Sequence, residues 1–313
     1  GCGNDIGTCQ FKSKDFTHWT YVGAFHSNGG GMWECPDFFN IPGTSSYLLK
    51  ASVSSKDWWA LGDYHENTEE PLRADSFVPR SGDILEGGQL YDYGQFYASK
   101  AFYDPKGKRQ ILIGWVSYHC AGTDWSGVQT FPRTVELDPS GLSIVTNPIK
   151  EIERLRASTG SEANVVVKGG ATHQVPYCGA QLDVEVTFMG SFSQASSFGL
   201  RALVSKQVAG FQTIAPAGVA LTVKVTGPGE ATLQGQPFKF DAGKPVTLRV
   251  LVDHSIVEGF AQQGRAVSTL PYCPPSAYAT GLEIFNSGSD DLTANVTVHQ
   301  LKTANIVPMK III

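Results

Sequence analysis

Long apolar runs and clusters of positive charge are both missing from this sequence. No stretch of the chain approaches the roughly 20 apolar residues that a membrane-spanning helix needs. Lysine and arginine number 24 against 29 acidic residues, and the net charge of −5 is spread without a basic patch that would attract phosphate groups. We therefore expect neither a membrane nor a nucleic acid as a partner.

Metal-binding patterns are missing as well. The six cysteines form no Cys-x-x-Cys pair and have no histidine at zinc-ligand spacing, so we expect no metal and no cofactor. Cys178 and Cys273 lie in similar Pro-Tyr-Cys turns, and we predict a disulfide between them, whereas Cys35 is expected to be a free thiol. The one sequon, at Asn295, predicts N-glycosylation. Together these features favour an oxidising compartment.

Helical periodicity is nearly absent too. Short β-branched and aromatic runs recur between clusters of Gly, Pro, Asn, Asp and Ser, which predicts an all-β fold. One short helix is predicted at about residues 148–156, where Ile149, Ile152 and Leu155 repeat every three residues. We expect this helix, within a linker at residues 148–158, to separate two domains at residues 1–147 and 159–313.

A strand, tight turn and strand recur three times before the predicted linker, at residues 37–49, 101–113 and 135–145. Such a repeat is typical of β-propeller blades. Three blades are too few, because a propeller closes its ring with roughly four to eight. The chain also begins at Gly1 without a methionine, so we expect the missing blades to precede it.

Strand-like runs also fill the second half, with the spacing of a β-sandwich. Alternation is clearest in residues 182–187, where every second side chain is expected to enter a core while the acids Asp183 and Glu185 face water. The predicted strands are residues 164–168, 181–188, 199–204, 219–225, 246–252, 256–260 and 282–285.

The segment with the most chemical content is Trp-Glu-Cys-Pro-Asp at residues 33–37, directly after three glycines at 29–31. A carboxyl group beside Trp33 in a cleft would be partly desolvated, which raises its pKa towards the range of a general acid. Considered alone, the same pair also fits a surface glutamate with an aromatic neighbour. Chemistry therefore leaves both interpretations of Glu34 open.

Five segments in the same order resemble glycoside hydrolase family 32, the invertases and fructan hydrolases, in its plant-type form. They are residues 11–19, 33–37, 91–104 with 111–115, 131–135 and 250–258. The resemblance spans nearly the whole chain and implies a five-bladed β-propeller, here partial, followed by a C-terminal β-sandwich.

The resemblance also implies a retaining mechanism with Glu34 as general acid/base. In such enzymes a second carboxylate, roughly 5–5.5 Å from the acid, forms a covalent glycosyl-enzyme. The family carries this nucleophile in an Asn-Asp-Pro-Asn-Gly motif and a third acid in Arg-Asp-Pro, and neither occurs here; Asp5 lies in a segment without the proline. We expect an N-terminal chain or segment of the same precursor to supply them.

Substrate contacts implied by the resemblance are Trp33, Asp92 and Trp115, although Asp92 as a turn cap and Trp115 as a core residue compete with this interpretation. The expected substrate is sucrose or a fructan. Because residues 83–89 lack the lysine that many sucrose-cleaving members carry there, the choice between the two stays open. The expected location is secreted, in the cell wall, or vacuolar. The alternative function is an inactive homologue that binds carbohydrate or protein.

Overall fold

The computed structural model describes residues 7–28, 32–70, 73–80, 82–192, 196–205 and 218–303. The chain divides into two compact units. The first consists of Gly1–Pro148, Leu233–Phe238 and Phe260–Pro271, and the second of Ile149–Thr232, Lys239–Gly259 and Tyr272–Ile313. The one helix in the described ranges is a 3-10 helix, Lys150–Leu155, at the place where a short helix is predicted.

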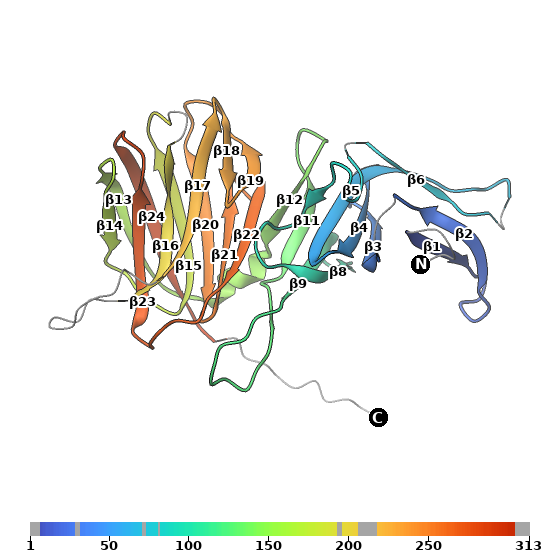
Figure 1. Cartoon of the computed structure of the whole chain (residues 1–313), viewed down its shortest axis with the longest axis horizontal. Helices are drawn as coiled ribbons and strands as arrows, with labels where there is room; N and C mark the ends of the chain where they lie inside the picture. Colours follow the sequence, from blue (N-terminus) through green and yellow to red (C-terminus); the bar gives the residue numbers. More distant parts are fainter. Residues whose placement is uncertain are drawn as a thin grey trace. The chain divides into compact units, whose positions relative to one another are not determined.

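The first unit contains a hairpin and two five-stranded sheets (Figure 1). The hairpin is β1 (Thr8–Lys12) with β2 (Thr20–His26). One sheet has the order β3-β4-β5-β6, with β7 also on β5: β3 (Glu34–Asn40), β4 (Tyr47–Val53), β5 (Lys56–His65), β6 (Ser76–Pro79) and β7 (Gln89–Leu90). The other has the order β10-β9-β11-β12, with β8 on β9: β8 (Tyr97–Asp104), β9 (Arg109–Val116), β10 (Val128–Gln129), β11 (Arg133–Leu137) and β12 (Ile144–Pro148).

The three predicted hairpins are present, but they do not form three blades. The third, β11–β12, is joined to the second because Arg133, Thr134 and Val135 of β11 pair with β9. Two hairpins in series make one sheet, so a strand-turn-strand repeat corresponds to half a blade. The first unit is thus a partial, unclosed β-propeller.

Apolar side chains cover both faces of the β3–β7 sheet. Leu48 and Leu61 enter a cluster with Leu112, Val135 and Ile144 of the β8–β12 sheet. Their neighbours along the strands, Leu49 and Ala60, enter a second cluster with Phe77 and Ile84. Successive side chains of a strand point to opposite faces, so β4 and β5 contribute to both clusters.

The predicted β-sandwich is present, and it has two six-stranded sheets (Figure 1). One has the order β13-β24-β15-β20-β21-β22: β13 (Arg156–Val167), β24 (Leu292–Leu301), β15 (Gln181–Met189), β20 (Val246–Asp253), β21 (Ile256–Ala261) and β22 (Ala266–Pro271). The other has the order β14-β23-β16-β17-β18-β19: β14 (Thr172–Val175), β23 (Ala279–Asn286), β16 (Ser197–Ser205), β17 (Val219–Gly227), β18 (Glu230–Leu233) and β19 (Gln236–Lys239).

Asp183 corrects one expectation about the sandwich. Its apolar neighbours Leu182 and Val184 are buried as predicted, but Asp183 is itself 0% exposed. Arg249 of the neighbouring strand β20 and Arg156 of β13, the next strand but one on the other side, donate to its carboxylate at 2.8–2.9 Å. Their long side chains cover a position that alternation alone assigns to water.

One carboxylate attaches the β1–β2 hairpin to the β5–β6 region. Asp75, 5% exposed, accepts hydrogen bonds from Gln10 (2.6 Å), Lys12 (2.7 Å) and the Tyr64 hydroxyl (2.8 Å). Burial raises the pKa of Asp75, but the hydrogen bonds from Lys12, from the Asn67 N–H, and from Gln10 and Tyr64 outweigh it and lower the pKa to about 2.

We expect Asp75→Asn to lower the free energy of unfolding by about 2 kcal/mol at pH 7. A carboxyl group whose pKa is depressed by folding stabilises the protein above its unfolded pKa of about 3.8 and loses that contribution as the pH falls through about 2. Urea unfolding at pH 7, 4 and 3 should therefore show the difference shrinking below pH 4. Asp63→Asn, which removes a half-exposed carboxylate of β5, is the control; a pH-independent difference for Asp75→Asn would contradict the assignment.

Candidate active site

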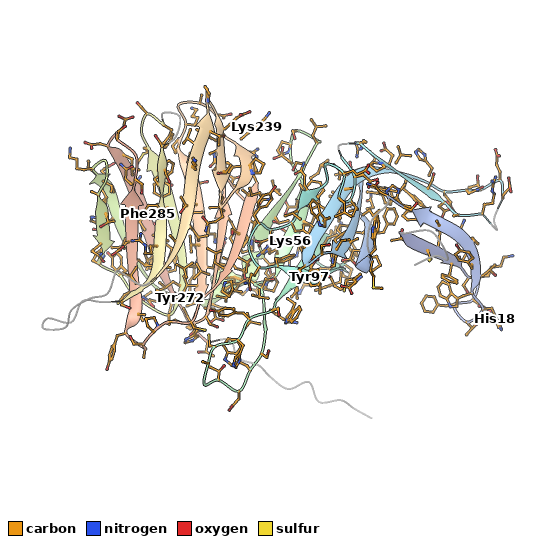
Figure 2. All side chains as sticks on the ribbon, viewed as in Figure 1. His18, Lys56, Tyr97, Lys239, Tyr272 and Phe285 are labelled. Carbon is orange, nitrogen blue, oxygen red and sulfur yellow. The ribbon has the colours of Figure 1, made fainter. Side chains whose placement is uncertain are left out.

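Glu34 is the first residue of β3, and its exposed side chain meets a tyrosine from another sheet. The hydroxyl of Tyr97, the first residue of β8, donates to Glu34 Oε2 at 2.5 Å. Figure 2 labels Tyr97 among the side chains of the first unit. Directly after Glu34 the β3–β4 register shifts, and Cys35 adopts a φ of 44°. A bulge of this kind re-aims a side chain at the end of a strand.

Tyr97 is a site residue that the sequence interpretation missed. The hydrogen bond to Glu34, then burial, then the nearby negative charges raise the pKa of Tyr97 to about 12. The phenol is therefore protonated at neutral pH and acts only as a donor to the carboxylate. The two residues are 63 positions apart, and nothing in either local segment signals that they meet.

Trp115 occupies the position in β9 directly opposite Tyr97. Directly paired residues of adjacent strands project to the same face, so the indole lies beside the tyrosine that contacts Glu34. Its side chain is 42% exposed, which excludes the interpretation of Trp115 as a core residue. A half-exposed aromatic face next to a carboxyl group is a suitable surface for a sugar ring.

A second acid of the same motif is structural. Asp37 is 8% exposed and accepts hydrogen bonds from the ammonium of Lys100 and from the backbone N–H of Ala101, the latter at 2.7 Å. Lys100 also donates to the Pro36 carbonyl at 2.8 Å. Both donors belong to β8, so these bonds tie the strand of Glu34 to the strand of Tyr97.

Asp92 does not lie at a substrate surface, contrary to expectation. Its side chain is 0% exposed and pairs with the equally buried Arg133 at 2.9 Å. Thr269 donates to it through both its hydroxyl (2.6 Å) and its N–H (2.8 Å), and the N–H of Gly94 donates at 2.8 Å, as in an Asx turn. Protein donors occupy both of its carboxylate oxygens. Asp92 therefore caps a turn, as the competing interpretation holds, and it also forms a buried ion pair.

Trp33 is half-buried and packs against the core cluster that contains Leu49, Phe77 and Ile84. Its indole N–H is buried without a partner among the described residues. A substrate contact through Trp33 remains a proposal. The three glycines at 29–31 lie outside the described residues.

The predicted disulfide is wrong. Cys178 is a free thiol, whereas Cys273 is disulfide-bonded, as are Cys9 and Cys120. A disulfide requires Cα atoms within about 7 Å and suitably directed side chains, and similar local sequence carries no information about either. Cys35 is free, as predicted.

Asn295 lies in β24, where its side-chain carbonyl accepts the N–H of Asn164 at 2.8 Å. Glycosylation there remains a prediction.

In residues 83–89, the segment that lacks the lysine of many sucrose-cleaving members, the carboxylate of Asp83 pairs with His26 Nε2 at 2.8 Å. No metal-binding group of three or more His, Cys, Asp or Glu occurs in the part of the chain that the structure describes. None of the helices described there is long and apolar enough to cross a membrane.

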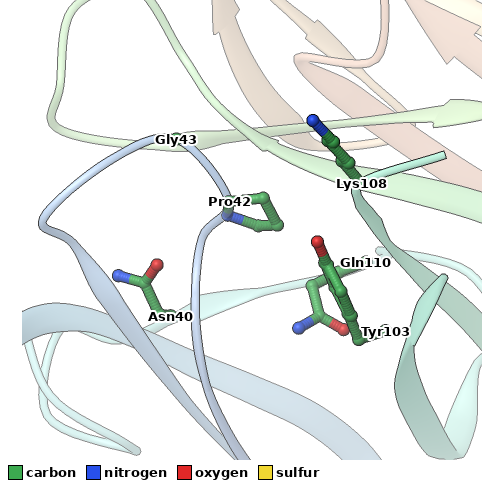
Figure 3. Close-up of a pocket in the computed structure, with 6 residues that line it drawn as sticks. All are labelled: Asn40, Pro42, Gly43, Tyr103, Lys108 and Gln110. Atoms are coloured by element: carbon green, nitrogen blue, oxygen red, sulfur yellow. The ribbon is translucent and has the colours of Figure 1, made fainter. Parts of the chain in front are cut away.

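A pocket of about 550 Å³ lies at the other ends of β3 and β8 (Figure 3). The β3–β4 turn contributes Pro42 and Gly43, and the β8–β9 hairpin contributes Tyr103 and Lys108. Asn40, at this end of β3, lies six positions after Glu34, which corresponds to about 20 Å of strand. The pocket is therefore distinct from the candidate site.

Comparisons with known proteins agree with the resemblance. The model of the glycosyl hydrolases family 32 N-terminal domain matches residues 4–148, and that of the family's C-terminal domain matches residues 151–300. An insoluble β-fructofuranosidase isoenzyme of Arabidopsis thaliana is 33% identical over 90% of this chain, and a fructan 6-exohydrolase of Beta vulgaris is 31% identical over 95%. The chain spans 60% and 59% of the lengths of these relatives.

Solved structures give the same result. The crystal structure of fructan 1-exohydrolase IIa from Cichorium intybus has a TM-score of 0.82 at 25% identity, and the match covers 96% of this chain and 68% of that one. An exo-inulinase from Aspergillus awamori shares the fold, with a TM-score of 0.69 at 17% identity and coverage of 94% and 62%.

Proposed function

Because this chain belongs to glycosyl hydrolase family 32, we propose that it is the C-terminal part of a β-fructofuranosidase that hydrolyses sucrose or a fructan. The observation that carries the proposal is the contact between Glu34 and Tyr97. It gives a solvent-accessible carboxyl group a fixed orientation beside an exposed tryptophan. The carboxyl group belongs to the glutamate of the segment at residues 33–37 that resembles the family's acid/base motif.

Glu34 acts as general acid and then as general base. Tyr97 holds Oε2, so Oε1, which has no hydrogen-bond partner in the described ranges, is left to deliver the proton to the glycosidic oxygen. A second carboxylate attacks the anomeric carbon and forms a fructosyl-enzyme. Glu34, now ionised, removes a proton from the water that releases fructose, and the configuration is retained.

We propose that the nucleophile lies on an N-terminal segment of the same precursor, either continuous with this chain or a separate chain. The β1–β2 hairpin and its surroundings expose large apolar side chains that support such a partner. They are Phe11, Phe16, Trp19, Tyr21 and Met32, all at least 50% exposed. A segment that completes the propeller would cover this face and place its carboxylate opposite Glu34.

The substrate in this proposal stacks on Trp115, whose exposed ring lies beside Tyr97. The relatives divide between β-fructofuranosidases and fructan exohydrolases, so sucrose and fructans are both candidates. A secreted protein of the cell wall or the vacuole fits the disulfide-bonded cysteines and the sequon, since disulfides persist in oxidising compartments.

The test is an assay of the natural full-length protein on sucrose and on inulin. We expect fructose release from at least one substrate, with the β-anomer of fructose appearing first in proton NMR spectra, because two inversions retain the configuration. Mass spectrometry of the same material, before and after reduction, should detect the nucleophile-bearing segment. A folded protein that binds either sugar without cleaving it would instead support the non-catalytic alternative.

A further inference from the structure

The two strands that carry Glu34 and Tyr97 are irregular at corresponding places. In β3 the register shifts between Glu34 and Asp37, and in β8 it shifts between Tyr97 and Lys100. Each shift contains a non-glycine residue with positive φ: Cys35 follows Glu34 and Ala98 follows Tyr97. Such conformations persist only where surrounding contacts hold them.

A buried ion pair holds both irregular segments. Lys50 is 0% exposed, and its ammonium donates to the carbonyls of Cys35 (3.1 Å) and Ser99 (2.7 Å). Asp57, 3.3 Å from that ammonium, accepts the backbone N–H of Ser99 at 2.8 Å. The Ser52 hydroxyl joins the two charges, 2.8 Å from Lys50 Nζ and 2.5 Å from Asp57.

The location of these bonds distinguishes this ion pair from an ordinary buried one. A buried pair by itself indicates only that the fold accommodates it. Here the hydrogen bonds of the pair reach the backbone of Cys35 in β3 and of Ser99 in β8, which lie one and two positions after the two site residues. A displacement of either backbone by about 1 Å would break the contact between Tyr97 and Glu34, since O–H···O hydrogen bonds need oxygen–oxygen distances of about 2.5–3.0 Å.

We propose that Lys50, supported by Asp57 and Ser52, is a positioning residue that sets the separation of β3 and β8 at which Tyr97 hydrogen-bonds to Glu34. Lys50 touches no reacting atom and acts through the backbone of Cys35 and Ser99. Its importance for turnover rests on the function proposed above, but the position of Tyr97 can be measured without turnover.

The first test follows the ionisation of Tyr97 in the full-length protein labelled with 13C-tyrosine, the signal being assigned with Tyr97→Phe. Its pKa is about 12, raised by the hydrogen bond to Glu34, then by burial, then by the charges of Glu34, Asp57 and Cys35. In Lys50→Met we expect ionisation about one to two pH units lower, towards the ordinary value. Loss of a positive charge alone would shift it upwards, so a downward shift reports the lost hydrogen bond.

Lys56→Met is the matched control. Lys56 lies in the same β4–β5 hairpin and donates to the Gly94 carbonyl at 2.9 Å, a backbone contact away from Cys35 and Ser99. We expect this variant to leave the Tyr97 titration unchanged. Ser52→Ala, which keeps the ion pair and removes only the linking hydroxyl, should shift it in the same direction as Lys50→Met but less, and it serves if Lys50→Met does not fold.

The second test is kinetic. In an active full-length enzyme, Lys50→Met should lower kcat about 100-fold and change KM less than threefold, because misplacement of a catalytic group impairs the chemical step. Folded variants at Lys50 and Ser52 whose Tyr97 ionises as in the parent protein would overturn the proposal. If the parent releases no fructose while Tyr97 still shifts, the proposed function is wrong and the positioning role stands.

Discussion

Replacing Glu34 by glutamine should lower kcat for sucrose or fructan hydrolysis by a factor of about 100 to 10,000, the usual contribution of a general acid/base. Glutamine has nearly the same shape, and its side-chain carbonyl can still accept the hydrogen bond from Tyr97, so the site should stay assembled. The measurement is fructose release by the full-length protein. KM should change much less than kcat, because the lost proton transfer belongs to the transition state.

A comparison of substrates with different leaving groups distinguishes a loss of acid catalysis from a general disturbance of the active site. A fructoside with an acidic phenol as leaving group needs little protonation, so the first step should be impaired far less by Glu34→Gln than with sucrose. Glu136→Gln is the matched control, since Glu136 is an exposed glutamate of β11 in the same unit. Equal losses of kcat/KM, which reports the first step, on both substrates, or full activity of Glu34→Gln, would remove Glu34 from the proposed mechanism.

Replacing Arg133 by methionine should lower the free energy of unfolding by about 3–5 kcal/mol, because it leaves the charge of Asp92 buried without its partner. The guanidinium is 0% exposed, lies 2.9 Å from the Asp92 carboxylate and donates to Thr269 at 2.6 Å. It also lies 4.8 Å and 5.2 Å from the ring centres of Phe96 and Phe260. Urea unfolding of the full-length protein is the measurement.

A double variant identifies the cause of that loss. Replacing Asp92 by leucine in the Arg133→Met background removes the unpaired charge, so part of the lost stability should return. Arg73→Met is the control, because Arg73 and Glu70 form a pair that is 70% and 61% exposed, and such surface pairs contribute about 0–1 kcal/mol. A loss for Arg133→Met as small as that for Arg73→Met would show that the buried pair does not stabilise the unit.

Local sequence patterns predicted most of the fold. The alternation of residues 182–187 corresponds to β15, and the three strand-turn-strand segments correspond to the hairpins β3–β4, β8–β9 and β11–β12. These features depend on neighbours within a few residues, because side-chain direction alternates along a strand and turns use characteristic residues. The assignment to blades failed because it depends on β9 pairing with β11, a contact between hairpins.

The features of the candidate site likewise fall into those that local sequence predicts and those that depend on contacts between distant segments. The motif at residues 33–37, which contains Glu34, and the resemblance to a propeller-and-sandwich family could be recognised in the amino-acid sequence, because those signals are contiguous in the chain. Three other features became visible in the folded chain: Tyr97 hydrogen-bonds to Glu34, Asp92 is buried against Arg133, and Cys178 is free. Each of these facts depends on the distance between atoms of different strands or loops. Register shifts and bulges determine that distance, and local sequence does not encode them.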